Sequence, residues 1–468
     1  MKKLLVSFCL ILVSHTAQAG LPTPIASALK KAGVPESSTS IYVQAVDGKY
    51  AQLSLNANKP MNPASVMKLV TTYAALDLLK PTFTWKTEVY RDGVVEDGVL
   101  HGNLIIKGYG DPSFKEDEFR RLLVSVRQQG LREITGDLII DKSYFATSVA
   151  NHKVFDNEKW RSYNALPSAF LVNGRHTSFK FTTHEGRVNI SQEVELPEVK
   201  IVNNMALVKN GCGSWRNRLT YDVNTSKTKA TVTFGGKLSS RCGEKYLELS
   251  LFDDEHYAYF IFKNLWRQLG GVLNGKLRSQ TEMPLRVVKL VVQDSQPLAN
   301  IVRDVNKWSN NVMARQILLT VAANYHDQPA SEVRGMLAVK SWMVDNGRNA
   351  DSWVIENGSG LSRIERVTAK GLGSMLLDAY EGPLMSELMS SLPILSLDGT
   401  LTSRLRKKPV SGRAHMKTGS IKGVKAIAGY VLDAKNRRNV VVMIVNHAKA
   451  SSSQKAQDAL IEWVYNRP

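Results

Sequence analysis

Apolar residues cover almost every side of a stretch that begins near residue 63 and ends before Pro81. They are Val66, Met67, Leu69, Val70, Tyr73, Ala74, Leu76, Leu78 and Leu79. This spacing is typical of a helix that is buried over most of its surface. Asn62 suits the N-cap, and Pro63 suits the first helical position, where an N–H would lack a partner. The pattern therefore predicts a helix over 63–80 in the centre of a domain, with Pro81 ending it.

The two outer parts of the chain combine helices with strands. Before residue 63 we expect a short helix at 25–31 and a hairpin of strands at 40–46 and 50–55. After residue 295 the expected helices are 298–306, 308–323, 331–345, 369–380 and 452–465, and the expected strands are 413–418, 424–433 and 440–446. One α/β (α+β) domain, with an antiparallel sheet flanked by helices, accounts for both outer parts.

The middle of the chain is rich in strands and self-contained in its pattern, which predicts insertions into the outer domain. The expected division is 20–84 with 295–468 as the outer domain, 85–110 with 277–294 as a small β-rich inserted domain, and 111–276 as a second β-rich inserted domain that carries both mature cysteines.

Residues 1–19 have the pattern of a secretory signal. Lys2 and Lys3 precede an apolar run over 4–13, and Ala17-Gln18-Ala19 resembles a cleavage site. No later run of eighteen apolar residues follows. We therefore expect an exported, periplasmic protein without a membrane anchor.

The mature chain has two cysteines, Cys212 and Cys242, because Cys9 lies in the signal. An oxidising compartment favours a disulfide between them, with two free buried thiols as the alternative. A loop of this length would contribute about 3 to 4 kcal/mol in the chain-entropy model.

The formal net charge is +19, and removal of Lys2 and Lys3 leaves +17. Outside the cytoplasm this charge suggests peripheral association with anionic lipid or cell-wall polymer, or simply a basic soluble surface. The sequence carries no nucleic-acid motif, and its aromatic residues are not interleaved with basic ones, so we expect no nucleic-acid partner.

Ser65 and Lys68 are one helical turn apart at the start of the expected helix. A serine becomes a useful nucleophile when a neighbour accepts its proton, and a lysine can do so if its pKa is lowered. The same spacing occurs at Ser27/Lys30, Ser226/Lys229 and Ser452/Lys455, so the pair alone is weak evidence.

Two further motifs follow in order. Ser309-x-Asn311 is expected at a helix start, and Lys417-Thr418-Gly419 on a strand. Ser-x-Asn also occurs at Ser54/Asn56 and Ser162/Asn164, whereas Lys-Thr-Gly occurs once. The ordered set of three is specific, and it is the set found in penicillin-binding proteins and class A β-lactamases.

The large insert after the first motif narrows the resemblance. The chain resembles the peptidase S13 family, D-alanyl-D-alanine carboxypeptidases and endopeptidases of the penicillin-binding protein 4 type. The similar stretches are Gly108-Tyr-Gly-Asp-Pro112, Ile134-Thr-Gly-Asp137, Gly358-Ser-Gly-Leu-Ser-Arg363 and Leu397-Asp-Gly-Thr-Leu401. The chain departs from the family pattern at Glu356-Asn357, where an aspartate is expected, and at Leu395-Ser396, where a glycine is more usual.

The resemblance and the chemistry together imply roles for the motif residues. Ser65 would attack a D-Ala-D-Ala type bond and form an acyl-enzyme, with Lys68 as the base. Desolvation or a nearby cation would have to lower the pKa of Lys68, and Lys417 is the expected cation. Ser309 would pass a proton to the leaving amine, and Asn311 would hold the substrate amide. Thr418, with Lys417, would bind the terminal carboxylate of the substrate. The N–H groups of Ser65 and of Ser420, which follows Gly419, would form the oxyanion hole. Arg363 and Asp156 would contact a stem-peptide side chain.

The implied partners are peptidoglycan stem peptides, and β-lactam antibiotics as acylating inhibitors. We expect no cofactor and no metal, since the nine histidines lack metal-ligand spacing. One alternative is a serine β-lactamase, although no convincing Glu-x-x-x-Asn loop is present. Another is a non-catalytic cell-wall-binding or penicillin-sensing protein, which the intact motifs disfavour.

Overall fold

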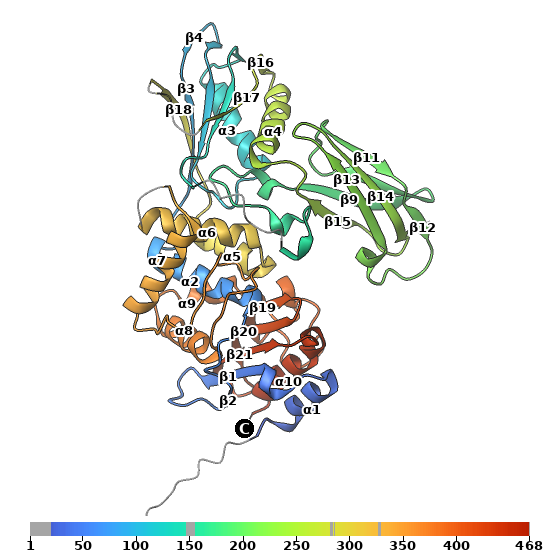
Figure 1. Ribbon diagram of the computed structural model, residues 1–468, viewed down its shortest axis with the longest axis vertical. Helices are drawn as coiled ribbons and strands as arrows, with labels where there is room; N and C mark the ends of the chain where they lie inside the picture. Colours follow the sequence, from blue (N-terminus) through green and yellow to red (C-terminus); the bar gives the residue numbers. More distant parts are fainter. Residues whose placement is uncertain (1–19, 147–154, 281–283, 285, 326–328, 468) are drawn as a thin grey trace, which may run out of the picture.

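The computed structural model describes residues 20–146, 155–280, 284, 286–325 and 329–467. The expected signal segment, 1–19, lies outside the described residues. Figure 1 shows three parts: a sheet with its helices, further sheets with α3 and α4 above it, and a group of long strands to one side.

A five-stranded antiparallel sheet organises the first part, in the order β19-β20-β21-β1-β2. Its strands are β1 (Thr39–Ala45), β2 (Leu53–Leu55), β19 (Ala414–Ile421), β20 (Val424–Leu432) and β21 (Arg438–Asn446). β1 pairs along its length with β21, so that Ile41 lies opposite Met443. The two ends of the chain therefore share one sheet, and the expected α/β (α+β) class with an antiparallel sheet is confirmed.

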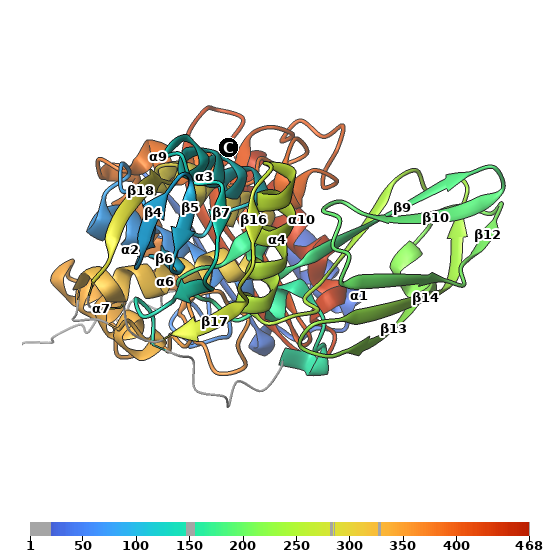
Figure 2. The ribbon, with the colours of Figure 1, turned by 90° about the horizontal axis from the view of Figure 1, so that it is seen from above.

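Helices cover both faces of this sheet, which explains why its strands are apolar on both sides (Figures 1 and 2). Ala426 and Ala428 pack with one group of helices, and the intervening Ile427 packs with the other. The larger group is α2 (Lys68–Leu79), α5 (Leu298–Trp308), α6 (Asn311–Tyr325), α7 (Glu332–Asp345), α8 (Ala369–Glu381) and α9 (Met385–Ser391). The smaller group is α1 (Thr23–Ala32) and α10 (Gln454–Tyr465).

Two further sheets lie beyond α5 and α6, with α3 (Glu116–Gln128) and α4 (Asp254–Gln268) against them (Figure 1). The five-stranded one has the order β17-β8-β6-β3-β18, and the four-stranded one β16-β7-β5-β4. Their strands are β3 (Lys86–Arg91), β4 (Val94–Glu96), β5 (Val99–His101), β6 (Leu104–Gly108), β7 (Glu133–Ile134), β8 (Leu138–Asp141), β16 (Val272–Leu273), β17 (Leu277–Gln280) and β18 (Val288–Asp294).

The strand pairing does not follow the expected division at residue 110. β8 pairs with β6 in parallel, and β7 pairs with β5, so strands from 133–141 complete the sheets of the first inserted segment. Such pairing depends on long-range contacts that periodicity does not reveal. The expected domain boundaries stay a prediction, and the pairing favours placing 133–141 with 85–110.

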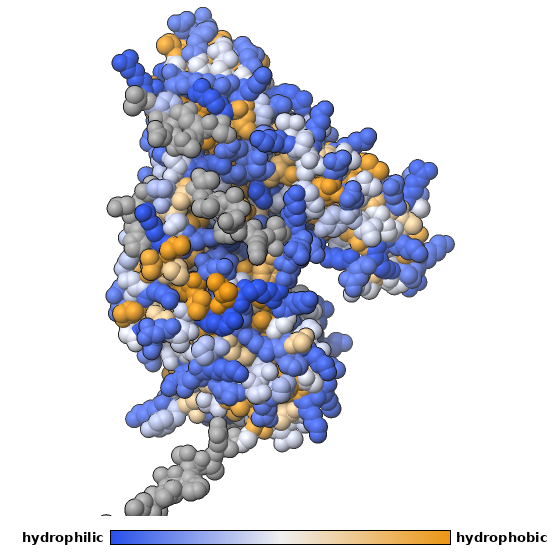
Figure 3. All heavy atoms as spheres, in the orientation of Figure 1, coloured by the Kyte–Doolittle hydropathy of each residue, from blue (hydrophilic) through white to orange (hydrophobic). Residues whose placement is uncertain are grey.

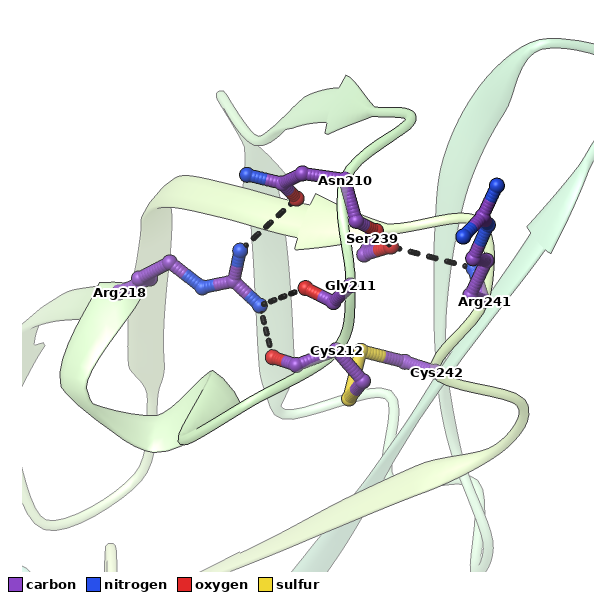
Figure 4. Close-up of a disulfide and its surroundings, with 7 residues drawn as sticks. All are labelled: Asn210, Gly211, Cys212, Arg218, Ser239, Arg241 and Cys242. Atoms are coloured by element: carbon purple, nitrogen blue, oxygen red, sulfur yellow. Dashed lines mark hydrogen bonds between the residues drawn. A yellow bond between two sulfur atoms is a disulfide. The ribbon is translucent and has the colours of Figure 1, made fainter.

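The remaining strands extend to one side as an arm (Figure 2). β9 (Thr177–His184) lies between β10 (Arg187–Gln192) and β15 (Lys245–Leu249), and β14 (Ala230–Ser239) pairs with β11 (Val199–Asn203), β12 (Ala206–Val208) and β13 (Leu219–Thr225). Cys212 and Cys242 form a disulfide here, as expected, and Arg218 donates to the carbonyl of Cys212 beside it (Figure 4).

The face of the molecule in Figure 3 is largely polar, and apolar residues gather on it around α7. Val333, Leu337 and Val344 are the exposed apolar residues of that helix. None of the helices in the described part of the chain is long and apolar enough to cross a membrane.

Candidate active site

Ser65 lies in a tight turn that precedes α2. The Oδ1 of Asn62 accepts a hydrogen bond from Ala64 N at 2.9 Å, and Ala64 has a φ of 45°. Residues Ala64–Met67 form a 3₁₀ helix, so the α-helix begins at Lys68 instead of residue 63. A left-handed alanine costs free energy, and such residues concentrate at functional sites. The turn leaves Ser65 half-buried.

Gly360 explains how a second loop comes close to this turn. A Cβ at Gly360 would lie 1.9 Å from the carbonyl oxygen of Ala64, and the φ of Gly360 is 81°. Only glycine fits both the close approach and the backbone conformation. The loop that contains Gly360 therefore forms one wall of the site.

Lys68 is fully buried, and its Nζ has three oxygen neighbours. The amine lies 3.2 Å from Ser65 Oγ and 2.5 Å from Asn311 Oδ1, and it donates to the carbonyl of Ser359. A neutral amine has two N–H groups and one lone pair. The amide and carbonyl oxygens can only accept, so they take the two N–H groups. The lone pair is then left for the Ser65 hydroxyl.

Ser309 joins α5 to α6 in a left-handed conformation, with a φ of 59°. We expected it at a helix start, but α6 begins at Asn311. The interruption separates the two side chains: Asn311 Oδ1 accepts from Lys68, whereas Ser309 Oγ accepts from Lys417 Nζ at 2.8 Å.

The third motif lies on β19, an edge strand of the five-stranded sheet. Lys417 is fully buried and also donates to the carbonyl of Thr418 at 2.9 Å. The hydroxyls of Thr418 and Thr400 are 2.8 Å apart, and Ser420 is exposed. A Cβ at Gly419 would lie 3.0 Å from Ser65 N, so this strand packs directly on the Ser65 turn. The three motifs thus meet at one place.

Both lysines of the site have lowered pKa values. Burial lowers the pKa of Lys68 well below its ordinary value, Lys417 lowers it further, and Glu365 acts in the opposite direction. Burial also lowers the pKa of Lys417 to about 7. Burial and the nearby cation Lys417 were the two expected causes of a lowered Lys68 pKa, and burial is the larger of the two.

Arg363 and Asp156 form an ion pair at 2.5 Å, although 207 residues separate them in the sequence. Arg363 also donates to the carbonyl of Lys422 and lies over the ring of Phe155. Both line a cavity of about 820 Å³ whose lining includes no residue of the three motifs. It adjoins them through Ser362, whose carbonyl accepts from Asn62 Nδ2 at 2.8 Å.

Comparisons with known proteins agree with this geometry. The model of the D-Ala-D-Ala carboxypeptidase 3 (S13) family matches residues 21–467. The chain belongs to this family. It is therefore a serine-type D-Ala-D-Ala carboxypeptidase, and the resemblance read from the motifs is confirmed.

Individual relatives of this S13 peptidase cover most of the chain. The D-alanyl-D-alanine carboxypeptidase DacB of Haemophilus influenzae is 28% identical over 398 residues, which are 84% of this chain and 81% of the relative. The crystal structure of penicillin binding protein 4 from Haemophilus influenzae matches with a TM-score of 0.79 and 25% identity, over 95% of this chain and 99% of that one. Its complex with a novel β-lactam matches with a TM-score of 0.74, 25% identity and the same coverage.

The sequence missed three residues of the S13 site. Ser359 and Gly360 fall in a stretch that resembles the family, but nothing in it indicated that the Ser359 carbonyl reaches Lys68. Glu365 is fully buried behind that loop, and no motif signalled it. A charged residue in a polar loop reads as solvent-exposed, so only the tertiary structure reveals its position.

A Gly419→Ala variant should acylate about 100-fold more slowly than the wild type, because its Cβ would press on the Ser65 N–H that we expect to bind the oxyanion. The rate of acylation by a chromogenic β-lactam measures this effect. Gly211→Ala is the control, since a Cβ there meets nothing within 4 Å. A wild-type rate in a folded Gly419→Ala protein would contradict the expected role of this strand.

Proposed function

We propose that this S13 peptidase hydrolyses the D-Ala-D-Ala bond of peptidoglycan stem peptides through an acyl-enzyme on Ser65. The single observation that best supports this is the environment of Lys68, whose two acceptor-only neighbours leave its lone pair facing Ser65 Oγ at 3.2 Å. Burial lowers the pKa of Lys68 well below its ordinary value, which increases the share of the neutral amine that a general base requires.

Acylation would begin when Lys68 accepts the Ser65 hydroxyl proton and Ser65 Oγ bonds to the carbonyl carbon of the penultimate D-alanine. The Ser65 and Ser420 N–H groups would bind the negative oxygen that forms, and each such donor lowers the barrier by roughly 3 kcal/mol. Gly419 lets the strand pack close to Ser65, since a Cβ there would lie 3.0 Å from Ser65 N.

The C–N bond then breaks, and the leaving amine needs a proton. Ser309 would supply it. The donor that faces Ser309 Oγ is Lys417 Nζ at 2.8 Å, so Ser309 can be reprotonated from Lys417. Lys417 would recover its proton as Lys68 releases the one that it took from Ser65. Water would then attack the acyl carbon while neutral Lys68 accepts its proton, and the ester bond would break as Ser65 Oγ takes that proton back.

Lys417 and Thr418 would bind the terminal carboxylate of the substrate. A carboxylate beside Lys417 favours its charged form, against the burial that lowers its pKa to about 7. A charged Lys417 in turn lowers the pKa of Lys68. Substrate binding would therefore favour the neutral, basic form of Lys68. Asn311 would orient the substrate amide with its side-chain nitrogen.

The same chemistry would open D-alanyl cross-links, which makes DD-endopeptidase activity a second reaction of this site. Arg363 and Asp156 would contact the stem-peptide side chain, since both line the cavity next to the Ser65 turn. We place this activity in the periplasm because residues 1–19 have the pattern of an export signal, and we retain peripheral association with the membrane or wall on account of the net charge.

β-Lactam antibiotics would acylate Ser65 as substrate analogues. The test is the intact mass of the purified protein after brief exposure to benzylpenicillin, together with release of free D-alanine from a D-Ala-D-Ala peptide. We expect D-alanine release and one long-lived adduct. Rapid destruction of the drug without an adduct would favour a β-lactamase, and neither reaction in a folded sample would favour the non-catalytic alternative.

A further inference from the structure

Glu365 is a fully buried carboxylate that binds the backbone of the loop next to Lys68. Its Oε1 accepts three backbone hydrogen bonds, from the N–H groups of Glu356, Asn357 and Gly358, at 3.1, 3.1 and 3.0 Å. Its Oε2 is buried and has no hydrogen-bond partner among the residues that the structure describes. One carboxylate oxygen thus gathers three consecutive amides into a turn.

The same turn includes Ser359, whose carbonyl is a neighbour of Lys68 Nζ. Asn357 Oδ1 accepts from the N–H and the hydroxyl of Ser359, at 3.0 and 2.7 Å, and this contact fixes the peptide whose carbonyl accepts from Lys68. The carbonyl of Gly358 accepts from Thr71 Oγ1 at 2.6 Å, which ties the turn to α2 one helical turn after Lys68. Asn357 and Ser359 therefore connect the Glu365 carboxylate to Lys68 Nζ through hydrogen bonds.

We propose that Glu365 is a positioning residue for acylation, whose carboxylate holds the 356–359 turn so that the Ser359 carbonyl accepts one N–H of Lys68 and directs its lone pair to Ser65. This inference rests on the proposed role of Lys68 as the base. It adds a residue that would act through the turn, since its carboxylate accepts hydrogen bonds from the turn's backbone amides.

The charge of Glu365 has a second effect on the same amine. Lys417 on β19 lowers the pKa of Lys68, whereas Glu365 raises it. The charge of Glu356, the first residue of the turn, raises the pKa of Glu365. Burial raises the pKa of Glu365 to about 6, so it carries its charge above that pH. Removal of this charge should lower the pKa of Lys68.

The two effects separate in two variants. Glu365→Gln keeps an acceptor oxygen for the three amides but removes the charge, so the rise of the acylation rate with pH should move to lower pH by about one unit. Glu365→Asp keeps the charge but is shorter by one methylene. The midpoint of its acylation rate against pH should equal that of the wild type. The maximal rate, on the plateau, should fall about tenfold because the shorter side chain holds the turn less well.

The measurement is the rate of acylation by a chromogenic β-lactam from pH 5 to pH 9. Thermal unfolding checks that each variant folds. Asp351→Asn is the control, because Asp351 is an exposed carboxylate on the segment that leads into the turn, and it should reproduce the wild-type profile.

A wild-type plateau in Glu365→Asp would overturn the proposal, and an unshifted midpoint in Glu365→Gln would overturn the effect of the Glu365 charge on Lys68. If Glu365→Gln does not fold, the plateau of Glu365→Asp alone decides. Failure of the wild type to acylate at Ser65 would overturn the proposed function instead, so the two failures are distinguishable.

Discussion

Replacement of Ser65 by alanine should reduce the turnover of a D-Ala-D-Ala peptide by about 10⁵-fold or more, because the variant cannot form the acyl-enzyme. The fold should not change, since Ser65 is half-buried and its Oγ contacts Lys68 alone among the hydrogen bonds of the described residues. Release of free D-alanine, measured with excess enzyme, gives the residual rate. The mass of the variant after exposure to benzylpenicillin should show no adduct.

Ser27→Ala is the matched control for this experiment. Ser27 and Lys30 have the same spacing as Ser65 and Lys68, but Ser27 is exposed on α1, in the smaller helix group. This variant should retain the wild-type rate and the adduct. Turnover by a folded Ser65→Ala protein would refute Ser65 as the nucleophile.

The contrast between these two pairs explains what the sequence could and could not predict about the site. Spacing alone did not distinguish Ser65/Lys68 from the three other Ser-x-x-Lys pairs. The order of three motifs along the chain did, because it carries information about the tertiary structure. What makes Lys68 a base, however, is burial together with the Ser359 carbonyl, and both depend on a loop nearly 300 residues away.

The fold was predictable where periodicity is strong. The strands at 424–432 and 438–446 and the helix before Pro81 follow from local pattern, because both faces of the sheet and most of that helix are buried. Two features required long-range contacts. The parallel pairing of β8 with β6 crosses the expected boundary at residue 110. Ser309 was expected at a helix start, but its backbone is left-handed and separates two helices.

Replacement of Lys68 by methionine should lower the acylation rate by about 10⁴-fold, the upper range for loss of a general base. Methionine has a similar length and fills the buried position, but it cannot accept the Ser65 proton. It also leaves Asn311 Oδ1 and the Ser359 carbonyl without the donor they have in the wild type. Single-turnover acylation by a chromogenic β-lactam, with thermal unfolding as the check on the fold, measures the loss.

The Lys68→Arg variant tests whether this position requires a base or only a positive charge. A guanidinium keeps the charge but stays protonated at every accessible pH. If Lys68 acts as a neutral base, the arginine variant should be as inactive as the methionine variant, and a rise to pH 9 should not restore it. The control is Lys30→Met, on the exposed pair of α1. An arginine variant that keeps more than about a tenth of the wild-type rate would show that charge suffices, and proton transfer would then have to be assigned to another group.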